Sequence, residues 1–214
     1  MNAPLAAATA GQDNASGPLD ALMTVEAALV TLAGVVRDAG ASGALAFDAP
    51  SLASLAAMQC EDEAHYHLLE ALGAISAADR FAIPPGLLES RDAAIDGLLS
   101  LKEVALGGQM ALARLIAAAD PPDQAFAESL FSLGAVEGGH QVMLRTLRGE
   151  TLPGGRAFLA WRFSDPRDVL DALSETGLLD AAEKPVLFPG PLPRDCRGVT
   201  GLVPETTEDA ELWS

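Results

Sequence analysis

Apolar residues recur every three or four positions from about residue 19 to residue 147, which is the spacing of one face of an α-helix. Proline is excluded from helix interiors, and within this part of the chain it occurs only at positions 50, 84, 85, 121 and 122. These prolines separate four apolar stretches. The sequence therefore predicts four helices, over about 19–38, 51–73, 91–119 and 123–148, and an all-α fold in the form of a four-helix bundle.

Each predicted helix carries one apolar stripe that would face the other helices. In chain order, the stripe residues are Leu19, Leu22, Leu29, Ala33 and Val36, then Leu55, Met58, Leu69 and Leu72, then Leu99, Leu106, Met110 and Ala113, and finally Phe126, Leu130, Leu133, Leu144 and Leu147.

The chain outside these helices differs in composition. Residues 1–18 show no apolar period, and after Gly149 seven prolines interrupt the chain. We expect a flexible N-terminal arm over 1–18, the bundle over 19–149, and a C-terminal extension over 150–214 that packs on the bundle or trails from it. The extension should contain one short helix, with Asp165 as its N-cap and Pro166 at its first position, ending at Gly177.

The charge balance excludes some partners. Lys and Arg total 13 against 30 Asp and Glu, a net charge of −17, which repels phosphate backbones and anionic membrane surfaces. We therefore expect no nucleic-acid partner. No uncharged apolar run reaches the ~18 residues of a membrane span, and the N-terminus lacks the features of a signal peptide. We expect a cytoplasmic protein without a membrane partner, with Cys60 and Cys196 both reduced because neither has a CxxC partner.

Polar residues interrupt all four stripes at positions that belong to the stripe. They are Glu26 in the first stretch, Asp62 and His65 in the second, Glu103 in the third, and Glu137 and His140 in the fourth. We expect the four carboxylates and two imidazoles to face one interior. Burying an unpaired carboxylate costs several kcal/mol, so positive charge must neutralise them. Two divalent cations would balance four carboxylates.

The spacing of three residues in Asp62–His65 and Glu137–His140 places acid and imidazole on one helical face. The order Glu, acid-x-x-His, Glu, Glu-x-x-His, with the segment Glu61 to Gly73 reading EDEAHYHLLEALG, resembles the ferritin-like superfamily over about residues 19–149. The resemblance is to bacterial ferritin-like domain proteins with a di-iron carboxylate pattern.

This resemblance implies a non-haem site for two divalent metal ions, iron or manganese, held by Glu26, Asp62, His65, Glu103, Glu137 and His140. It also implies iron handling or an oxidoreductase activity with oxygen or peroxide. The metal ions and oxygen or peroxide would then be the partners, and the sequence allows a homo-oligomer. No separate catalytic residue is indicated.

Two alternatives remain open at this stage. The second predicted helix has Asp62 where the family usually has Glu, and this shorter side chain would either bind only one metal ion or leave ligation to the neighbouring Glu61. The bundle could also be free of metal, its polar interior held by water or internal hydrogen bonds, and act as a structural or partner-binding protein. No GxGxxG, P-loop or GxSxG sequence occurs, so nothing indicates nucleotide binding or a serine hydrolase.

Overall fold

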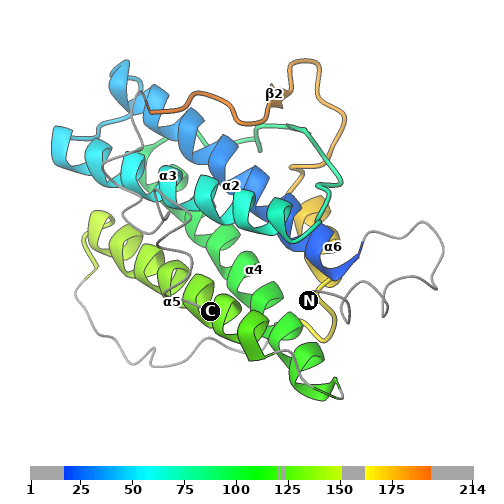
Figure 1. Ribbon diagram of the computed structural model, residues 1–214. Helices are drawn as coiled ribbons and strands as arrows, with labels where there is room; N and C mark the ends of the chain where they lie inside the picture. The colour runs from blue at the N-terminus through cyan, green and yellow to red at the C-terminus, as the bar shows by residue number, and fades with distance from the viewer. Residues whose placement is uncertain (1–16, 120, 122–123, 151–161, 194–214) are drawn as a thin grey trace.

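The computed structural model describes residues 17–119, 121, 124–150 and 162–193. Within these ranges the secondary structure is almost entirely helical (Figure 1). The helices are α2 (Pro18–Ala41), α3 (Ala49–Ala71), α4 (Arg91–Ala118), α5 (Gln124–Leu147) and α6 (Asp168–Glu175), and the two short strands are β1 (Arg80–Phe81) and β2 (Val186–Leu187). The prediction of an all-α fold is confirmed, and each of the four long helices lies within a few residues of its predicted range.

Local signals explain where the long helices begin and end. Asp48 and Ser90 cap α3 and α4, because their side chains accept hydrogen bonds from the backbone N–H groups of Ser51 and Ala93 at 2.9 and 3.1 Å. After α3 and α5 the chain turns at Gly73 and Gly149, whose φ angles of +89° and +83° lie in the left-handed region that favours glycine.

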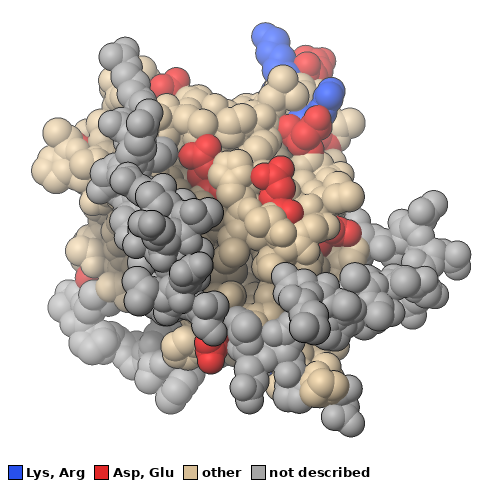
Figure 2. All heavy atoms as spheres, viewed as in Figure 1, with Lys and Arg blue, Asp and Glu red and all other residues tan. Residues whose placement is uncertain are grey.

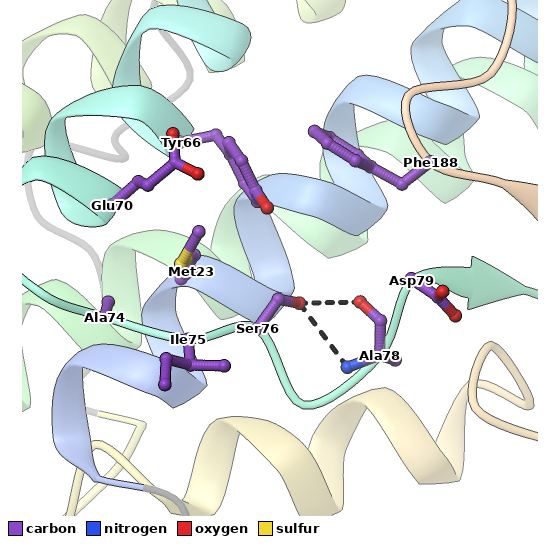
Figure 3. Close-up of a pocket in the computed structure, with 9 residues that line it drawn as sticks. All are labelled: Met23, Tyr66, Glu70, Ala74, Ile75, Ser76, Ala78, Asp79 and Phe188. Atoms are coloured by element: carbon purple, nitrogen blue, oxygen red, sulfur yellow. Dashed lines mark hydrogen bonds between the residues drawn. The ribbon is translucent and has the colours of Figure 1, made fainter.

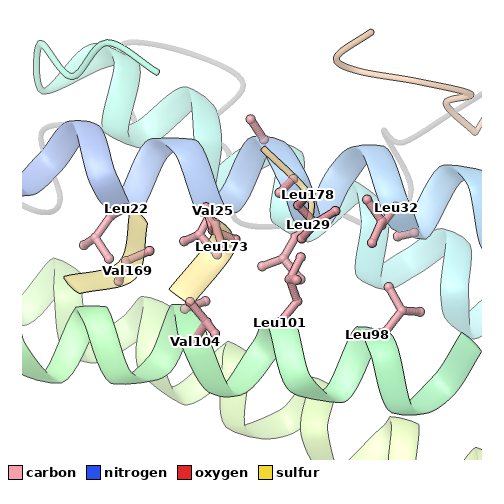
Figure 4. Close-up of a cluster of buried hydrophobic side chains, with 14 of the residues drawn as sticks. Leu22, Val25, Leu29, Leu32, Leu98, Leu101, Val104, Val169, Leu173 and Leu178 are labelled. Atoms are coloured by element: carbon pink, nitrogen blue, oxygen red, sulfur yellow. The ribbon is translucent and has the colours of Figure 1, made fainter. Parts of the chain in front are cut away.

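The long helices pack in two pairs of consecutive helices, α2 against α3 and α4 against α5 (Figure 1). Helix α2 also packs against α4. Part of the apolar core lies between α2, α4 and α6. Figure 4 shows its side chains, which are Leu22, Val25, Leu29 and Leu32 from α2, Leu98, Leu101 and Val104 from α4, and Val169, Leu173 and Leu178 from α6 and the turn after it. This packing fixes the facing surfaces of α2 and α4.

Among the described residues, α2 is the one helix long and apolar enough to cross a membrane by length and composition. Of its most apolar window, 83% is buried inside the protein. Contacts with α3, α4 and α6 account for that burial. A helix that is surrounded by other helices is apolar on every side.

The described part of the C-terminal extension packs on the long helices. α6 contacts α2 and α4, and β2 pairs antiparallel with β1, Arg80 opposite Leu187 and Phe81 opposite Val186. The backbone carbonyl of Pro191 accepts hydrogen bonds from the side chains of Gln59 and Arg37 at 2.7 and 3.0 Å. The expected arm over 1–18 lies almost wholly outside the described residues.

The short helix begins two residues later than expected, at Asp168 rather than Pro166. The Asp165 side chain accepts a hydrogen bond from the Arg167 backbone N–H at 2.8 Å. The next backbone hydrogen bond, from Asp168 N–H to Asp165 C=O, spans three residues and closes a tighter turn than that of an α-helix. This tight turn precedes the helix proper. The predicted end is confirmed, with Gly177 at a φ of +78°.

Cys60 is buried in α3 and disulfide-bonded, so the expectation that it is reduced was wrong. The other cysteine of the chain, Cys196, lies outside the described residues. Cys60 has no CxxC partner, so the local sequence gives no signal for its disulfide bond.

Candidate metal centre

Four polar side chains from three helices meet in the interior. Glu26 comes from α2, Asp62 and His65 from α3, and Glu137 from α5, and one ligand atom of each lies within 4.8 Å of the others. The three acids are 0% exposed and His65 is 7% exposed. We call these residues the four-residue cluster. All four were predicted from the interrupted stripes.

The helices place these side chains through ordinary packing. Glu26 lies between the buried residues Leu22 and Leu29 on α2, so its side chain shares their inward face. Asp62 and His65 are three residues apart on α3 and therefore project from one face. Glu137 projects from the face of α5 that also carries the buried Leu133 and Leu144.

His65 lies between two carboxylates. Its Nδ1 is 3.3 Å from Glu137 Oε1 and 3.7 Å from Glu26 Oε2. Burial acts to lower the pKa of His65, but the neighbouring carboxylates of Glu137 and Glu26 outweigh it and raise the pKa to about 10. Burial, together with the charge of Glu137, raises the pKa of Glu26 to about 7. The interior therefore disfavours the negative charge of Glu26.

A buried lysine that the sequence reasoning did not identify lies beside the cluster. Lys102 of α4 is 0% exposed, and its Nζ donates a hydrogen bond to Asp62 Oδ1 and lies 3.0 Å from Glu137 Oε2 and 2.9 Å from His140 Nδ1. Burial acts to lower the pKa of Lys102, but the charges of Asp62 and Glu137 raise it above its ordinary value. Burial likewise acts to raise the pKa of Asp62, and Lys102 and His140 hold it well below its usual range.

Glu103 is not part of the cluster, which corrects its expected inward orientation. Its side chain is 35% exposed, and Glu103 Oε1 lies 3.5 Å from Arg145 Nη2 of α5. The inward face of α4 runs through Leu98, Lys102 and Gln109 instead. Glu103 follows Lys102 by one residue, which turns its side chain about 100° away.

His140 lies beside Lys102 and connects it with the protein surface. Its Nδ1 is 3.3 Å from Asp62 Oδ1, and its Nε2 is 2.5 Å from Oε2 of Glu61, whose side chain is 37% exposed. Burial and the charge of Lys102 act to lower the pKa of His140, but Asp62 and Glu61 outweigh them and raise it. The structure thus brings His140 next to the cluster, with Glu61 outside it.

Each member of the cluster has a buried polar atom without a hydrogen-bond partner. The atoms are Glu26 Oε2, Asp62 Oδ2, His65 Nδ1 and Glu137 Oε2. Two of them keep ion-pair contacts, Glu137 Oε2 with Lys102 Nζ at 3.0 Å and His65 Nδ1 with Glu137 Oε1 at 3.3 Å. Buried polar atoms are rarely left unpaired, because each then carries its full cost of desolvation. A divalent metal ion binds carboxylate oxygens and imidazole nitrogens that converge in this way. The residues present therefore fit a metal ion.

A separate shallow pocket of about 260 Å³ lies on the surface between α2, α3 and the loop after α3 (Figure 3). Tyr66 of α3 and Phe188 line it, with their ring centroids 4.3 Å apart. No member of the four-residue cluster lines this pocket. Tyr66 packs against the C-terminal extension, and it takes no part in the buried network.

Comparison of the whole chain with models of protein families, with curated proteins and with solved structures found no match.

Proposed function

We propose that this protein binds a divalent metal ion between the four long helices of a ferritin-like bundle, and that the bound metal serves a redox reaction with oxygen or peroxide, or iron handling. The observation that carries the proposal is that ligand atoms of four buried residues from α2, α3 and α5 lie within 4.8 Å of one another, three of the residues being carboxylates. Glu26 Oε2 and Asp62 Oδ2 accept no hydrogen bond within the protein, and a cation between the four residues would neutralise their charge.

The order of the donors along the chain supports the ferritin-like interpretation. A lone Glu on the first long helix, an acid-x-x-His pair on the second and a Glu-x-x-His pair on the fourth is the arrangement of carboxylate-bridged metal sites in such bundles. Asp62 and His65 form the second-helix pair, and Glu137 and His140 the fourth-helix pair. The third long helix departs from the pattern, because it directs Lys102 inward and Glu103 outward.

The donor set favours iron(II) or manganese(II). Three carboxylates and one imidazole are hard and intermediate donors, and the described cluster contains no thiolate that would favour zinc or copper. Iron(II) held by such donors can supply electrons to oxygen or peroxide. The part of this chain is to hold the ion away from bulk water, with Gln109 Nε2 near Glu26 Oε1 at 3.4 Å to orient that carboxylate.

A metal-free structural or partner-binding bundle is the second candidate, and Lys102 is the observation that favours it. Its ammonium already neutralises part of the buried negative charge through Asp62 and Glu137. In this case the network would be a set of internal ion pairs that fixes the packing of α3, α4 and α5.

Metal affinity of matched variants separates the two candidates. Glu137→Gln removes one cluster carboxylate, whereas Glu103→Gln removes a partly exposed carboxylate that pairs only with Arg145 at the surface. Titration calorimetry with manganese(II) should show affinity at least about a hundredfold weaker for Glu137→Gln, because a ligand and its charge are lost. Glu103→Gln should bind as the wild type does.

Circular dichroism on the same samples shows whether each variant keeps its helices. Wild-type protein that is fully helical and binds neither manganese(II) nor anaerobic iron(II) would contradict the proposal and favour the metal-free bundle. Equal loss of affinity in both variants would show that the bound metal is held at the surface.

A further inference from the structure

The buried network has two halves that share Asp62 and Glu137. One half contains Glu26 and His65, whose Oε2 and Nδ1 atoms lie 3.7 Å apart and have no hydrogen-bond partner. The other contains His140 and the Lys102 ammonium, which contacts both shared acids and lies 2.9 Å from His140 Nδ1. The second half has the acid and imidazole donors of a metal site, but its centre is already filled by a cation.

We propose that Lys102 limits the site to one divalent ion, because its ammonium occupies the position between Asp62, Glu137 and His140 that a second ion would need. This inference rests on the proposed function. It replaces the expectation of a dinuclear centre, which assumed an inward carboxylate on α4.

The balance of buried charge supports the same conclusion. The fully buried carboxylates are Glu26, Asp62 and Glu137, and the buried ammonium is Lys102. With His65 bound to the ion as a neutral imidazole and His140 paired with Glu61, one divalent ion and the ammonium together neutralise the three carboxylates. A second divalent ion would leave two uncompensated positive charges in the interior, where charges are weakly screened and their desolvation is costly.

The burial of Lys102 also favours a single divalent ion. Lys102 lies on the inward face of α4, between the buried Leu98 and Ala105, and its side chain is 0% exposed. It has no solvent-exposed position to which the ammonium could withdraw without repacking α4. A second ion could therefore enter only by displacing a cation that two carboxylates hold.

The decisive experiment counts manganese ions per chain in full-length wild type, Lys102→Glu and Lys184→Glu. Lys184 is the only other lysine of the chain and is exposed, so it is the matched control. After anaerobic loading with excess manganese(II) and removal of unbound metal, native mass spectrometry should find one ion per chain in the wild type and in Lys184→Glu. It should find two in Lys102→Glu, with electron paramagnetic resonance showing the coupling between neighbouring manganese ions.

Lys102→Met keeps a long side chain without the charge and serves where Lys102→Glu does not fold. Its affinity for a second manganese ion should exceed that of the wild type at least about tenfold. Two coupled ions in the wild type would overturn this inference and leave the proposed function standing. Absence of metal from every protein would instead overturn the proposed function, and a folded Lys102→Glu with one ion would show that Lys102 does not set the number.

Discussion

Asp62 serves two neighbours with one carboxylate. Its Oδ1 accepts the hydrogen bond of Lys102 and lies 3.3 Å from His140 Nδ1, whereas Oδ2 is buried without a hydrogen-bond partner. The short side chain of Asp therefore fits a position where one oxygen is held by the protein and the other faces the cluster. The adjacent Glu61 points to His140 from the surface.

The neighbouring acids Glu61 and Asp62 give a direct test of which one binds metal. Asp62→Asn should weaken manganese(II) binding at least about a hundredfold, since a charged donor is lost, while Glu61→Gln should change it less than about threefold. Without metal, Asp62→Asn should also lower the free energy of unfolding by about 3 kcal/mol, because Lys102 loses a buried partner. Calorimetry and urea unfolding measure both. Loss of binding in Glu61→Gln alone would reverse the assignment.

The residues of the cluster could be predicted because each interrupts an apolar stripe on a helix with one clear inward face. Lys102 could not be predicted in this way, because α4 is apolar on two faces, one toward α2 and α6 and the other toward α5. The predicted stripe on this helix runs through Leu99 and Leu106, and Glu103 belongs to it. The equally regular stripe through Leu98, Ala105 and Leu112 contains Lys102, and a lysine is ordinarily assumed to be solvated.

At the scale of elements, α4 positions the site because it packs closely against α2 and α6. A Cβ atom on Gly108 would lie 2.7 Å from Leu22 Cδ2 and 2.5 Å from Val169 Cγ2. Glycine at this position lets the three helices approach. By contrast, a Cβ on Gly139 of α5 would meet nothing within 4 Å among the described residues.

These two glycines predict opposite effects of the same substitution. Gly108→Ala should lower the free energy of unfolding by about 1–3 kcal/mol through overpacking. Gly139→Ala should raise it by about 0.5–1 kcal/mol, because alanine is the better helix former. Urea unfolding of both variants provides the comparison. Similar behaviour of the two would mean that α4 and α6 are not in close contact.

The short elements were harder to predict than the long helices. Proline spacing and apolar period fixed α2 to α5 within a few residues, since both are local signals. β1 and β2 have two residues each and no strand pattern of their own, and their pairing follows from the return of the C-terminal extension across the loop after α3. This pairing depends on contacts between distant segments, which form only in the folded chain.

At the scale of the whole molecule, acidic residues predominate in number, but the site depends on a few buried charges. Figure 2 shows acidic side chains over several parts of one face, with Lys and Arg confined to a small group at its upper edge. These surface charges are solvated and contribute little to stability. The cluster and Lys102 instead place opposite charges where water does not screen them, and they link α2, α3, α4 and α5 at one level.

The most direct test of metal binding in the cluster is anomalous X-ray diffraction from crystals grown with manganese(II). We expect one anomalous peak per chain, within coordination distance of Glu26, Asp62, His65 and Glu137, and none at Glu103. A well-ordered interior without an anomalous peak, or a peak only at surface carboxylates, would contradict the account.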